Sequence, residues 1–469
     1  MTTPVELPDA SPSAIESTAC TKDDPPKSGR FRVRELVCMV LILVFGAGLS
    51  WERLSPTTRG TLWAEDVRNF IGNAVHSGPI TPLLHPYAGY LQLVPRLIAD
   101  VTVGFEPVSS WALSMAAGSC LVTGGCATVV FICSAEITDS TLLRVFIACI
   151  TLLDPLAPRE VLGNTANLHW YFLWTTPWLL IYRPRTRVGG WALGAVALLA
   201  ALSEIQMILF VPLLLWKWRD RIRRPVRGLF LIGLTGQIVA TLCAPRGASA
   251  GHLLGPGALG YGYLINCVMT IFDPNPKEVG SLISFGGAAV GIALLIPFAM
   301  AARYAVKQGT QVQRILAITL SLGSLVLYML AVEISPGAFY DYTAMSRTQL
   351  ADPWLARYGV VPSMFLIALI PLAYIVWAQA RHRPLASGRL SPIRSIAGRL
   401  MLATFLILLV IHLVPVATRR SNGPVLVTQV TAQEIVCSGQ SARHEVTLLG
   451  DPGPGWKVEL SCRYLREHG

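Results

Sequence analysis

Two adjacent carboxylates, Glu65 and Asp66, stand near the start of the stretch "WAEDVRNFIGNAVHSG", just after the first long apolar segment of the chain. At helical spacing, Val67, Phe70 and Ile71 fall on one apolar stripe, and Glu65 lies off it. The pattern predicts a short amphipathic helix lying in the membrane interface, with both acids at its positive N-terminal end. A carboxylate held there can take a proton from a hydroxyl group. An acid at this position can equally be a helix cap and nothing more.

Polar side chains that could complete a site recur in three later segments. The turn "HPYAGY" leads into a helix with an arginine, "GNTANLHW" opens an apolar run, and "ALSEIQ" places a glutamate between two apolar runs. A carboxylate in mid-membrane costs about 2.5–3.5 kcal/mol, so such a residue normally faces a cavity or a partner. The candidates are Tyr87, Tyr90, Arg96, Asn167, His169 and Glu204. For His169 a hydrogen-bonded structural role is favoured over a proton relay or a metal ligand, because no second ligand stands at zinc spacing.

The elements that must position these residues are transmembrane helices. Of the 469 residues, 53% are hydrophobic and 14% are charged, whereas a soluble domain carries about 25% charged residues. The expected fold is an all-α polytopic membrane protein with about 11 transmembrane helices. The apolar stretches that predict them are 35–51, 109–134, 141–157, 168–182, 188–203, 204–217, 228–244, 281–302, 314–333, 359–378 and 399–417.

Lysine and arginine set the expected orientation. They concentrate in 183–187, 217–227, 303–314 and 381–399, which the positive-inside rule assigns to the cytoplasm. The N-terminus is then cytoplasmic and the C-terminus extracytoplasmic, and chemistry is expected on the outer face, where most non-basic polar residues fall. Because the basic residues are spread over separate loops, the net charge of +11 needs no nucleic-acid partner. The expected parts are a disordered cytoplasmic tail at 1–34, a transmembrane domain at 35–417 and an extracytoplasmic appendage at 418–469.

Two cysteines differ from the others. Most cysteines lie in or beside apolar spans, where a thiol is usually a small buried hydrophobe. Cys437 and Cys462 instead flank two alternating stretches around a Pro/Gly turn in the tail. An outer tail can hold a disulfide, so we expect these two to be bridged and to tie a small β-rich unit; two unpaired thiols are the alternative.

Several strings together resemble a known superfamily. A membrane helix is followed by a first outer loop with paired acids at the head of an amphipathic helix, and then by many further spans. This arrangement resembles the GT-C superfamily of glycosyltransferases. The strings "W-A-E-D", "P-Y-A-G-Y-L", "G-N…N-L-H-W" and "S-E" also look like those of a group of actinobacterial multipass proteins of glycosyltransferase type. The resemblance covers most of residues 35–417.

The resemblance implies a reaction and a set of roles. The donor is a polyprenyl-phosphate-linked sugar, and the acceptor is a glycan, lipid or protein of the cell envelope. A first-loop acid is the general base of an inverting transfer; we favour Asp66, at the edge of the apolar stripe, with Glu65 in support. The leaving phosphate needs guanidinium groups, for which the outer candidates are Arg96, Arg159, Arg347 and Arg357. Arg357 and Tyr358 precede a span, at the expected headgroup level.

Cofactors and alternatives complete the sequence-based expectations. The chain has no nucleotide-binding loop motif, which favours a lipid-linked donor; no cofactor is certain, and a divalent cation stays open. A transporter or flippase of lipid-linked saccharides is the first alternative, in which Glu204 and the outer acids bind a cation or substrate, although no internal repeat is evident. A non-catalytic protein of envelope assembly is the second alternative.

Overall fold

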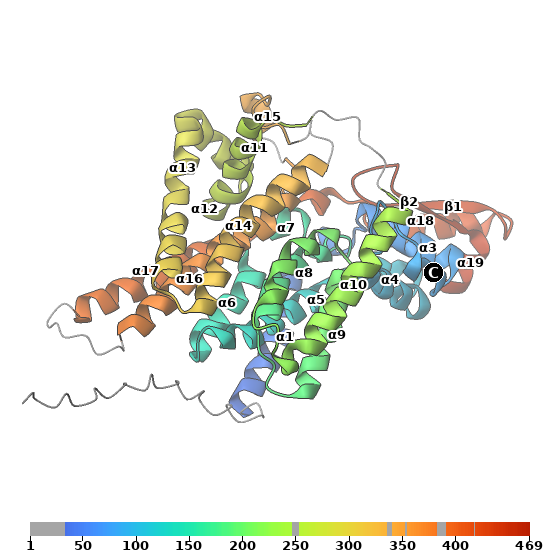
Figure 1. The fold of residues 1–469 in the computed structure, drawn as a ribbon. Helices are drawn as coiled ribbons and strands as arrows, with labels where there is room; N and C mark the ends of the chain where they lie inside the picture. The colour runs from blue at the N-terminus through green and yellow to red at the C-terminus, as the bar shows by residue number, and fades with distance from the viewer. Residues whose placement is uncertain (1–32, 246–252, 335–339, 352–353, 382–390, 417) are drawn as a thin grey trace, which may run out of the picture.

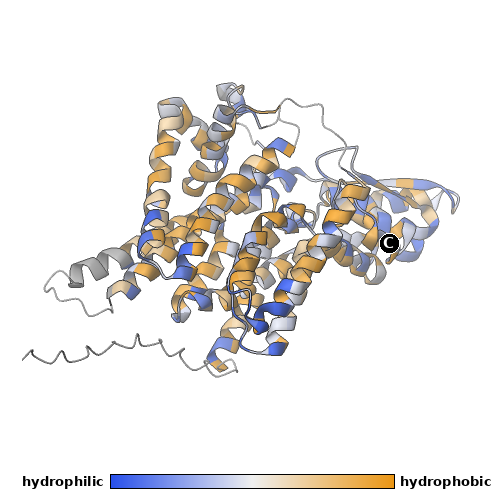
Figure 2. Ribbon diagram, viewed as in Figure 1, coloured by the Kyte–Doolittle hydropathy of each residue, from blue (hydrophilic) through white to orange (hydrophobic). Residues whose placement is uncertain are grey.

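The computed structural model describes residues 33–245, 253–334, 340–351, 354–381, 391–416 and 418–469. The expected disorder of 1–34 therefore falls almost wholly outside the described residues. Within them, every apolar stretch expected to span is helical, and Figure 2 shows hydrophobic residues along these helices. They are α1 (Val33–Glu52), α5 (Trp111–Cys133), α6 (Thr141–Leu153), α8 (Leu168–Ile181), α9 (Arg187–Ala201), η5 (Ile205–Leu215), α10 (Arg224–Cys243), α13 (Pro276–Gln308), α14 (Gln311–Ile334), α16 (Val360–Arg381) and α17 (Ser391–Ile411).

Among the described residues, seven helical segments are long and apolar enough to cross a membrane, by length and composition. The finer expectation of about eleven spans is not confirmed. The reason is length: α9 has 15 residues, or about 22 Å at the helical rise, and η5 has 11 residues in a 3₁₀ helix. Both fall short of a hydrocarbon core of about 30 Å.

Shorter elements connect the long helices. The described residues contain a single two-stranded antiparallel sheet, β1 with β2. The connecting elements are α2 (Pro56–Arg59), η1 (Asp66–Ile71), α3 (Gly72–Ser77), η2 (Thr81–Leu84), α4 (Leu93–Phe105), η3 (Val108–Ser110), η4 (Ser134–Glu136), α7 (Ala157–Glu160), η6 (Arg221–Arg223), α11 (Pro256–Tyr263), η7 (Leu264–Met269), α12 (Thr270–Phe272), α15 (Arg347–Ala351), η9 (Arg357–Gly359), η10 (Arg419–Asn422), α18 (Leu426–Ser438), β1 (Glu445–Leu449), β2 (Lys457–Ser461) and α19 (Cys462–His468).

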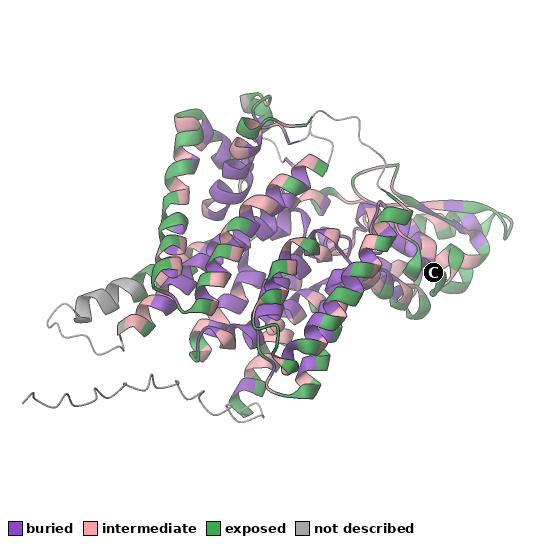
Figure 3. Cartoon of the chain, viewed as in Figure 1, coloured by how far each residue is buried: buried purple, intermediate pink, exposed green. Residues whose placement is uncertain are grey.

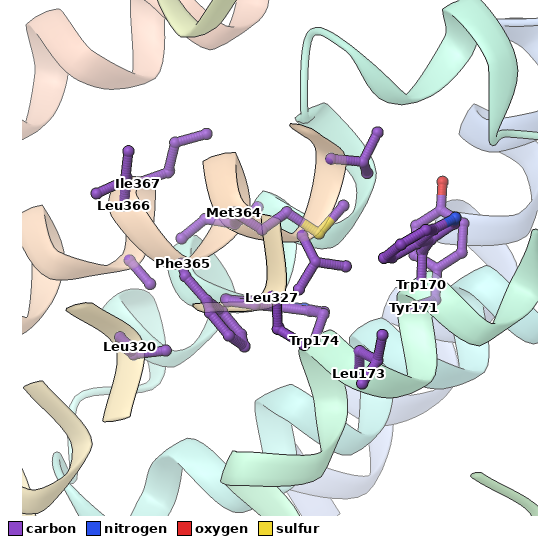
Figure 4. Close-up of a cluster of buried hydrophobic side chains, with 14 of the residues drawn as sticks. Trp170, Tyr171, Leu173, Trp174, Leu320, Leu327, Met364, Phe365, Leu366 and Ile367 are labelled. Carbon is purple, nitrogen blue, oxygen red and sulfur yellow. The ribbon is translucent and has the colours of Figure 1, made fainter. Parts of the chain in front are cut away.

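The core of the bundle is built around α8 and α16. Every residue of α8 but one is buried, and α16 is 94% buried along its apolar window, so other helices surround both (Figure 3). Figure 4 shows the aromatic and aliphatic side chains that interlock between α8, α14 and α16. The rings of Trp174 and Phe365 are 5.8 Å apart there. At the end of this core, Trp170 and Tyr358 meet edge to face with ring centroids 5.5 Å apart.

Two of the segments assigned to the cytoplasm by their charge, 183–187 and 217–227, bind acidic side chains at one end of the bundle. Glu35 accepts from Arg144 at 2.7 Å and from Arg185 at 2.6 Å. Arg223 donates to Glu136 at 2.8 Å. The segments assigned to the outside meet one another instead, as described below for the site. The two sets are thus separated in space as expected, and which of them faces the cytoplasm stays a prediction.

Residues 418–469, called the C-terminal unit below, form a compact unit beside α3 and α4 (Figure 1). A disulfide joins Cys437 and Cys462, the expected pair, with Cα atoms 5.3 Å apart. The expected strands are present as the hairpin β1–β2, but the unit is not β-rich, because the helices α18 and α19 flank this hairpin and contain more residues than the strands. The main chain of Asp451 donates to the carbonyl of Leu62 at 3.0 Å, which ties the hairpin turn to the first outer loop.

The first-loop helix packs on this C-terminal unit and not on lipid. Val67, Phe70 and Ile71 are almost completely buried. They belong to one hydrophobic cluster with side chains of the hairpin and of α18, such as Val458 and Leu448. The expectation of a membrane-interface helix is therefore wrong, because an apolar stripe has the same spacing whether its partner is lipid or protein.

Candidate functional site

A cavity of about 140 Å³ lies where the segments expected outside converge. This is well above the roughly 10–15 Å³ that a cavity needs to hold one water. Its described lining residues are Glu65, Tyr87, Ala88, Tyr90, Gln92, Ala166, Asn167, His169, Trp170, Glu204, Gln206, Ala331, Ile334, Arg357 and Tyr358. The expected substrate-binding residues that line it are Tyr87, Tyr90, Asn167, His169, Glu204, Arg357 and Tyr358. The other expected arginines, Arg96, Arg159 and Arg347, are not among its described lining residues. Of the acid pair, only Glu65 lines the cavity.

Glu65 faces this cavity from the residue that precedes η1. Its side chain is half-buried, and its Oε2 atom is buried without a hydrogen-bond partner among the described residues. A buried acceptor left without a donor costs about 1–3 kcal/mol. Such a cost is typical of a functional group whose partner is a ligand or a water.

Asp66 points to a different set of partners. Its side chain is 1% exposed. Oδ1 accepts from the Thr165 hydroxyl at 2.6 Å and from the Ala166 amide at 2.9 Å, and Oδ2 accepts from the Thr165 amide at 3.1 Å. Burial raises the pKa of this carboxyl to about 6, and the hydrogen bonds from Thr165 oppose the rise. The expected place for Asp66, at the edge of an apolar stripe by the membrane surface, is wrong, since η1 is a π-helix and the α-helical spacing does not hold there.

The loop 162–167 is held from two sides. Asp66 binds its amide groups, as above, and Arg420 of the C-terminal unit binds its carbonyls. The guanidinium of Arg420 donates to Leu162 at 2.8 Å and to Gly163 at 3.0 Å. Opposite charges thus fix opposite ends of the peptide dipoles, and the loop presents Asn167 to the cavity in one conformation.

Arg357 is the only lysine or arginine among the described cavity-lining residues. Its Nη1 lies 3.5 Å from Oε1 of Glu160, a long ion pair, and its side chain is 25% exposed. Oε2 of Glu160 accepts from the amides of Ala356 at 2.9 Å and Arg357 at 3.2 Å, which fixes the start of η9. The backbone here is therefore rigid, while the guanidinium keeps donors free for a ligand.

The other expected arginines serve the scaffold. Arg96 does not line the cavity; it donates to the carbonyls of Leu91 at 2.9 Å and His85 at 2.8 Å. Arg159 is buried and likewise donates to two main-chain carbonyls. The side chain of Arg347 lies outside the described residues. The sequence could not distinguish these roles, because it does not show whether an arginine binds main-chain carbonyls or a phosphate.

The aromatic turn is shaped by a residue from a distant helix. Tyr87 and Tyr90 exchange main-chain hydrogen bonds at 2.8 and 2.9 Å around Ala88 and Gly89, both with positive φ. The side-chain amide of Gln237, fully buried in α10, donates to the carbonyl of Gly89 at 2.8 Å. Sequence reasoning missed Gln237, although a lone amide inside an apolar span was an available signal.

His169 and Glu204 meet at the wall of the cavity. Nδ1 of His169 lies 2.9 Å from the carbonyl of Ala166, which can only accept, so this nitrogen carries the proton. Nε2 is left 3.8 Å from Oε2 of Glu204. Oε1 of Glu204 accepts from the amide of Gln206 and caps η5. Among the described residues, no group of three or more His, Cys, Asp or Glu side chains is arranged to hold a metal ion.

The cavity also contains polar residues that sequence reasoning did not select. Gln92, Gln206 and Trp170 line it, and the indole Nε1 of Trp170 is buried without a partner in the described part of the chain. Each stands within three residues of a selected position, so proximity was the available signal.

The described groups suit a ligand with many hydroxyls and one anionic group. Amide and carboxyl side chains can bind hydroxyls, aromatic faces can stack on a sugar ring, and Arg357 can bind the anion. Glu65 supplies an acceptor oxygen that has no donor among the described residues. Comparison of the chain with protein-family models, with curated proteins and with solved structures finds no match.

Proposed function

We propose that this membrane protein transfers a sugar from a polyprenyl-phosphate-linked donor to a hydroxyl of a cell-envelope glycan, lipid or protein, on the outer face of the membrane. One observation carries the proposal: the carboxylate oxygen of Glu65 without a described partner shares a cavity with the guanidinium of Arg357. Such a displacement requires a base for the acceptor proton and a cation for the leaving phosphate, and these two side chains line the same cavity.

In the proposed reaction, Glu65 acts at the acceptor. The acceptor hydroxyl attacks the anomeric carbon, and its proton passes to Oε2 of Glu65. The bond between the anomeric carbon and the phosphate oxygen breaks on the opposite face, and polyprenyl phosphate leaves with the electron pair. The configuration at the anomeric carbon is inverted. This assigns the base to Glu65, whereas the sequence favoured Asp66, because Asp66 has all its oxygens engaged with loop 162–167.

Arg357 acts at the leaving group. Among the described residues its guanidinium makes a 3.5 Å ion pair with Glu160 and lies 5.4 Å from the ring centroid of Tyr358, so it can turn to a phosphate without losing a short hydrogen bond. It stands where η9 leads into α16, which places a bound phosphate near the end of an apolar helix, as a lipid phosphate needs. The neighbouring Tyr358 and Trp170 give an apolar wall for the sugar or the first isoprene unit.

The test compares Glu65→Gln with wild type in nanodiscs, using polyprenyl-phosphate sugars and a cell-envelope acceptor fraction. The amide keeps the size of the side chain but cannot accept the proton, so the transfer rate should fall by about 10²–10⁴, with an unchanged melting temperature. Glu106→Gln is the matched control, because Glu106 is exposed and outside the cavity. A transfer rate within twofold of wild type would remove Glu65 as the base.

The 3.8 Å approach of His169 to Glu204 favours one alternative, a transporter of lipid-linked saccharides coupled to protons. Proteoliposomes loaded with a fluorescent lipid-linked saccharide distinguish the two functions. Transbilayer movement that is lost in Glu204→Gln and kept in Glu65→Gln, with no sugar transfer by wild type, would support transport. Sugar transfer without transbilayer movement would support the proposed enzyme.

A further inference from the structure

A second cavity, of about 630 Å³, lies at the other end of the molecule, among the segments that the charge pattern assigns to the cytoplasm. It is formed where α9 and α10 begin side by side (Figure 1). Four of its described lining residues are arginines and one, Asp220, is an acid. The arginines are Arg183, Arg187, Arg221 and Arg224.

Most of this positive charge is uncompensated within the protein. Asp220 is already paired with Arg183, whose Nε lies 2.9 Å from its Oδ2. Arg187, Arg221 and Arg224 make no ion pair or side-chain hydrogen bond in the described part of the chain, and all three are exposed. Three guanidinium groups around one hollow, without a carboxylate partner among the described residues, attract an anion.

The backbone adds to the positive electrostatic potential at this cavity. The 15-residue helix α9 starts at Arg187 and the 20-residue helix α10 starts at Arg224, so both positive helix ends lie at this cavity. The helices come close here because glycine permits it: a Cβ on Gly194 would lie 2.9 Å from the carbonyl of Pro225. Convergent helix starts with arginines beside them favour a phosphate group.

An apolar wall continues from the arginines along both helices. Trp191 is 59% exposed and Ile232 is 63% exposed, and with Leu229 they line the same cavity. A tryptophan at this level is typical of a membrane interface. The hollow thus combines basic side chains at the loop end with an exposed apolar surface along the two helices, which a water-soluble anion would not need.

We infer that this cavity binds an anionic phospholipid, with its phosphate between Arg187, Arg221 and Arg224 and an acyl chain against Trp191 and Ile232. Basic pockets between helices on the cytoplasmic side are suited to such headgroups. The site is separate from the outer cavity, and the inference does not depend on the proposed function.

The test measures lipid binding by the full-length protein. Native mass spectrometry in a neutral detergent, titrated with phosphatidylglycerol and with phosphatidylcholine, gives the two affinities. Wild type should prefer phosphatidylglycerol at least tenfold, and Arg187→Gln/Arg224→Gln should weaken its binding by about thirtyfold. Both side chains are exposed and unpaired, so the double variant should fold, as its melting temperature would verify.

Arg219→Gln is the matched control, because Arg219 is exposed on the adjoining loop, stacks near Trp218 and lies outside the cavity. It should bind phosphatidylglycerol within twofold of wild type. An equal loss in the control would show a non-specific charge effect and overturn the inference. Displacement of the lipid by millimolar inorganic phosphate would overturn it as well, since the cavity would then be a site for free anions.

Discussion

At the scale of single residues, the neighbours Glu65 and Asp66 turn to different sides of the first outer loop. Glu65 faces the cavity with one oxygen that has no partner in the described structure, and Asp66 is saturated by Thr165 and Ala166. A sequence identifies such a pair as acidic and adjacent. It cannot say which acid a loop 99 positions later will bind, because that depends on how two distant segments dock.

The hydrogen bonds of Asp66 predict the effect of Asp66→Asn. The asparagine Nδ2 group would meet either the Thr165 amide or the Ala166 amide, donor against donor. Loss of such a buried hydrogen bond should lower the free energy of unfolding by about 1–3 kcal/mol. The measurement is the melting temperature of the purified variant, compared with Glu65→Gln, which should melt like wild type. A stable Asp66→Asn protein that fails to transfer sugar would return the base to Asp66.

The same burial predicts a pH dependence of stability. The pKa of Asp66 is raised by burial from 3.8 to about 6, so between these values the folded state holds a proton that the unfolded state releases. The contribution of Asp66 to stability is therefore greatest below pH 4 and falls as the pH rises through about 6, by no more than about 3 kcal/mol. Unfolding of wild type and Asp66→Asn from pH 4 to pH 7 measures it as a difference. A difference that grows with rising pH would contradict the assignment.

At the scale of elements, each apolar stretch that was expected to span the membrane coincides with a helix, because a helix buried in lipid or in protein needs an apolar sequence. It did not give the number of spans, since α8, with 14 residues, lies inside the bundle and η5 is a short 3₁₀ helix. The same limit applies to η1, whose apolar stripe packs on the C-terminal hairpin. Hydrophobicity predicts that a face is covered, and the covering partner follows only from the assembled fold.

The aromatic turn gives a prediction at this scale. Gln237→Leu keeps the side-chain volume but removes one of the two side-chain donors to the carbonyl of Gly89, the other being the Thr241 hydroxyl at 2.7 Å, and it removes the acceptor of the Leu91 amide. The turn that carries Tyr87 and Tyr90 should therefore loosen. Since the turn lines the cavity but contains no proposed reacting group, KM for the donor should rise about five- to tenfold with kcat within about twofold. Thr235→Val, on the exposed face of α10, is the control. An unchanged KM would mean that the hydrogen bond from Thr241 and the main-chain hydrogen bonds of the turn are enough to hold it.

At the scale of the whole molecule, the C-terminal unit is part of the site and not an appendage to it. Its side chains share one hydrophobic cluster with η1, and Arg420 grips loop 162–167. The sequence identified the unit by its cysteine pair, because spacing and the turn between them are local. The packing of the C-terminal unit on the first loop could not be predicted, since neither segment contains a sequence pattern that identifies the other as its partner.

Removal of the disulfide is therefore expected to lower both the stability of the protein and its rate of sugar transfer. Both cysteines are fully buried in the cluster that contains Phe70. Cys437→Ala/Cys462→Ala should lower the free energy of unfolding by about 2–4 kcal/mol and reduce transfer, because η1 and Glu65 lose their support. Cys243→Ala, an exposed free cysteine, is the control. Full activity in the double variant, with a lowered melting temperature, would separate the unit from the site.

The grip of Arg420 on the first outer loop has a consequence for biosynthesis. Its hydrogen bond to the carbonyl of Thr61 joins residues 359 positions apart, and the same guanidinium fixes the loop behind Asn167. During translation, the part of the cavity wall that carries Glu65 is made early, but Arg420 leaves the ribosome long afterwards. A nascent chain then carries Glu65 on an unsupported helix, and we expect a product cut short before residue 420 to lack the proposed activity even when its spans insert.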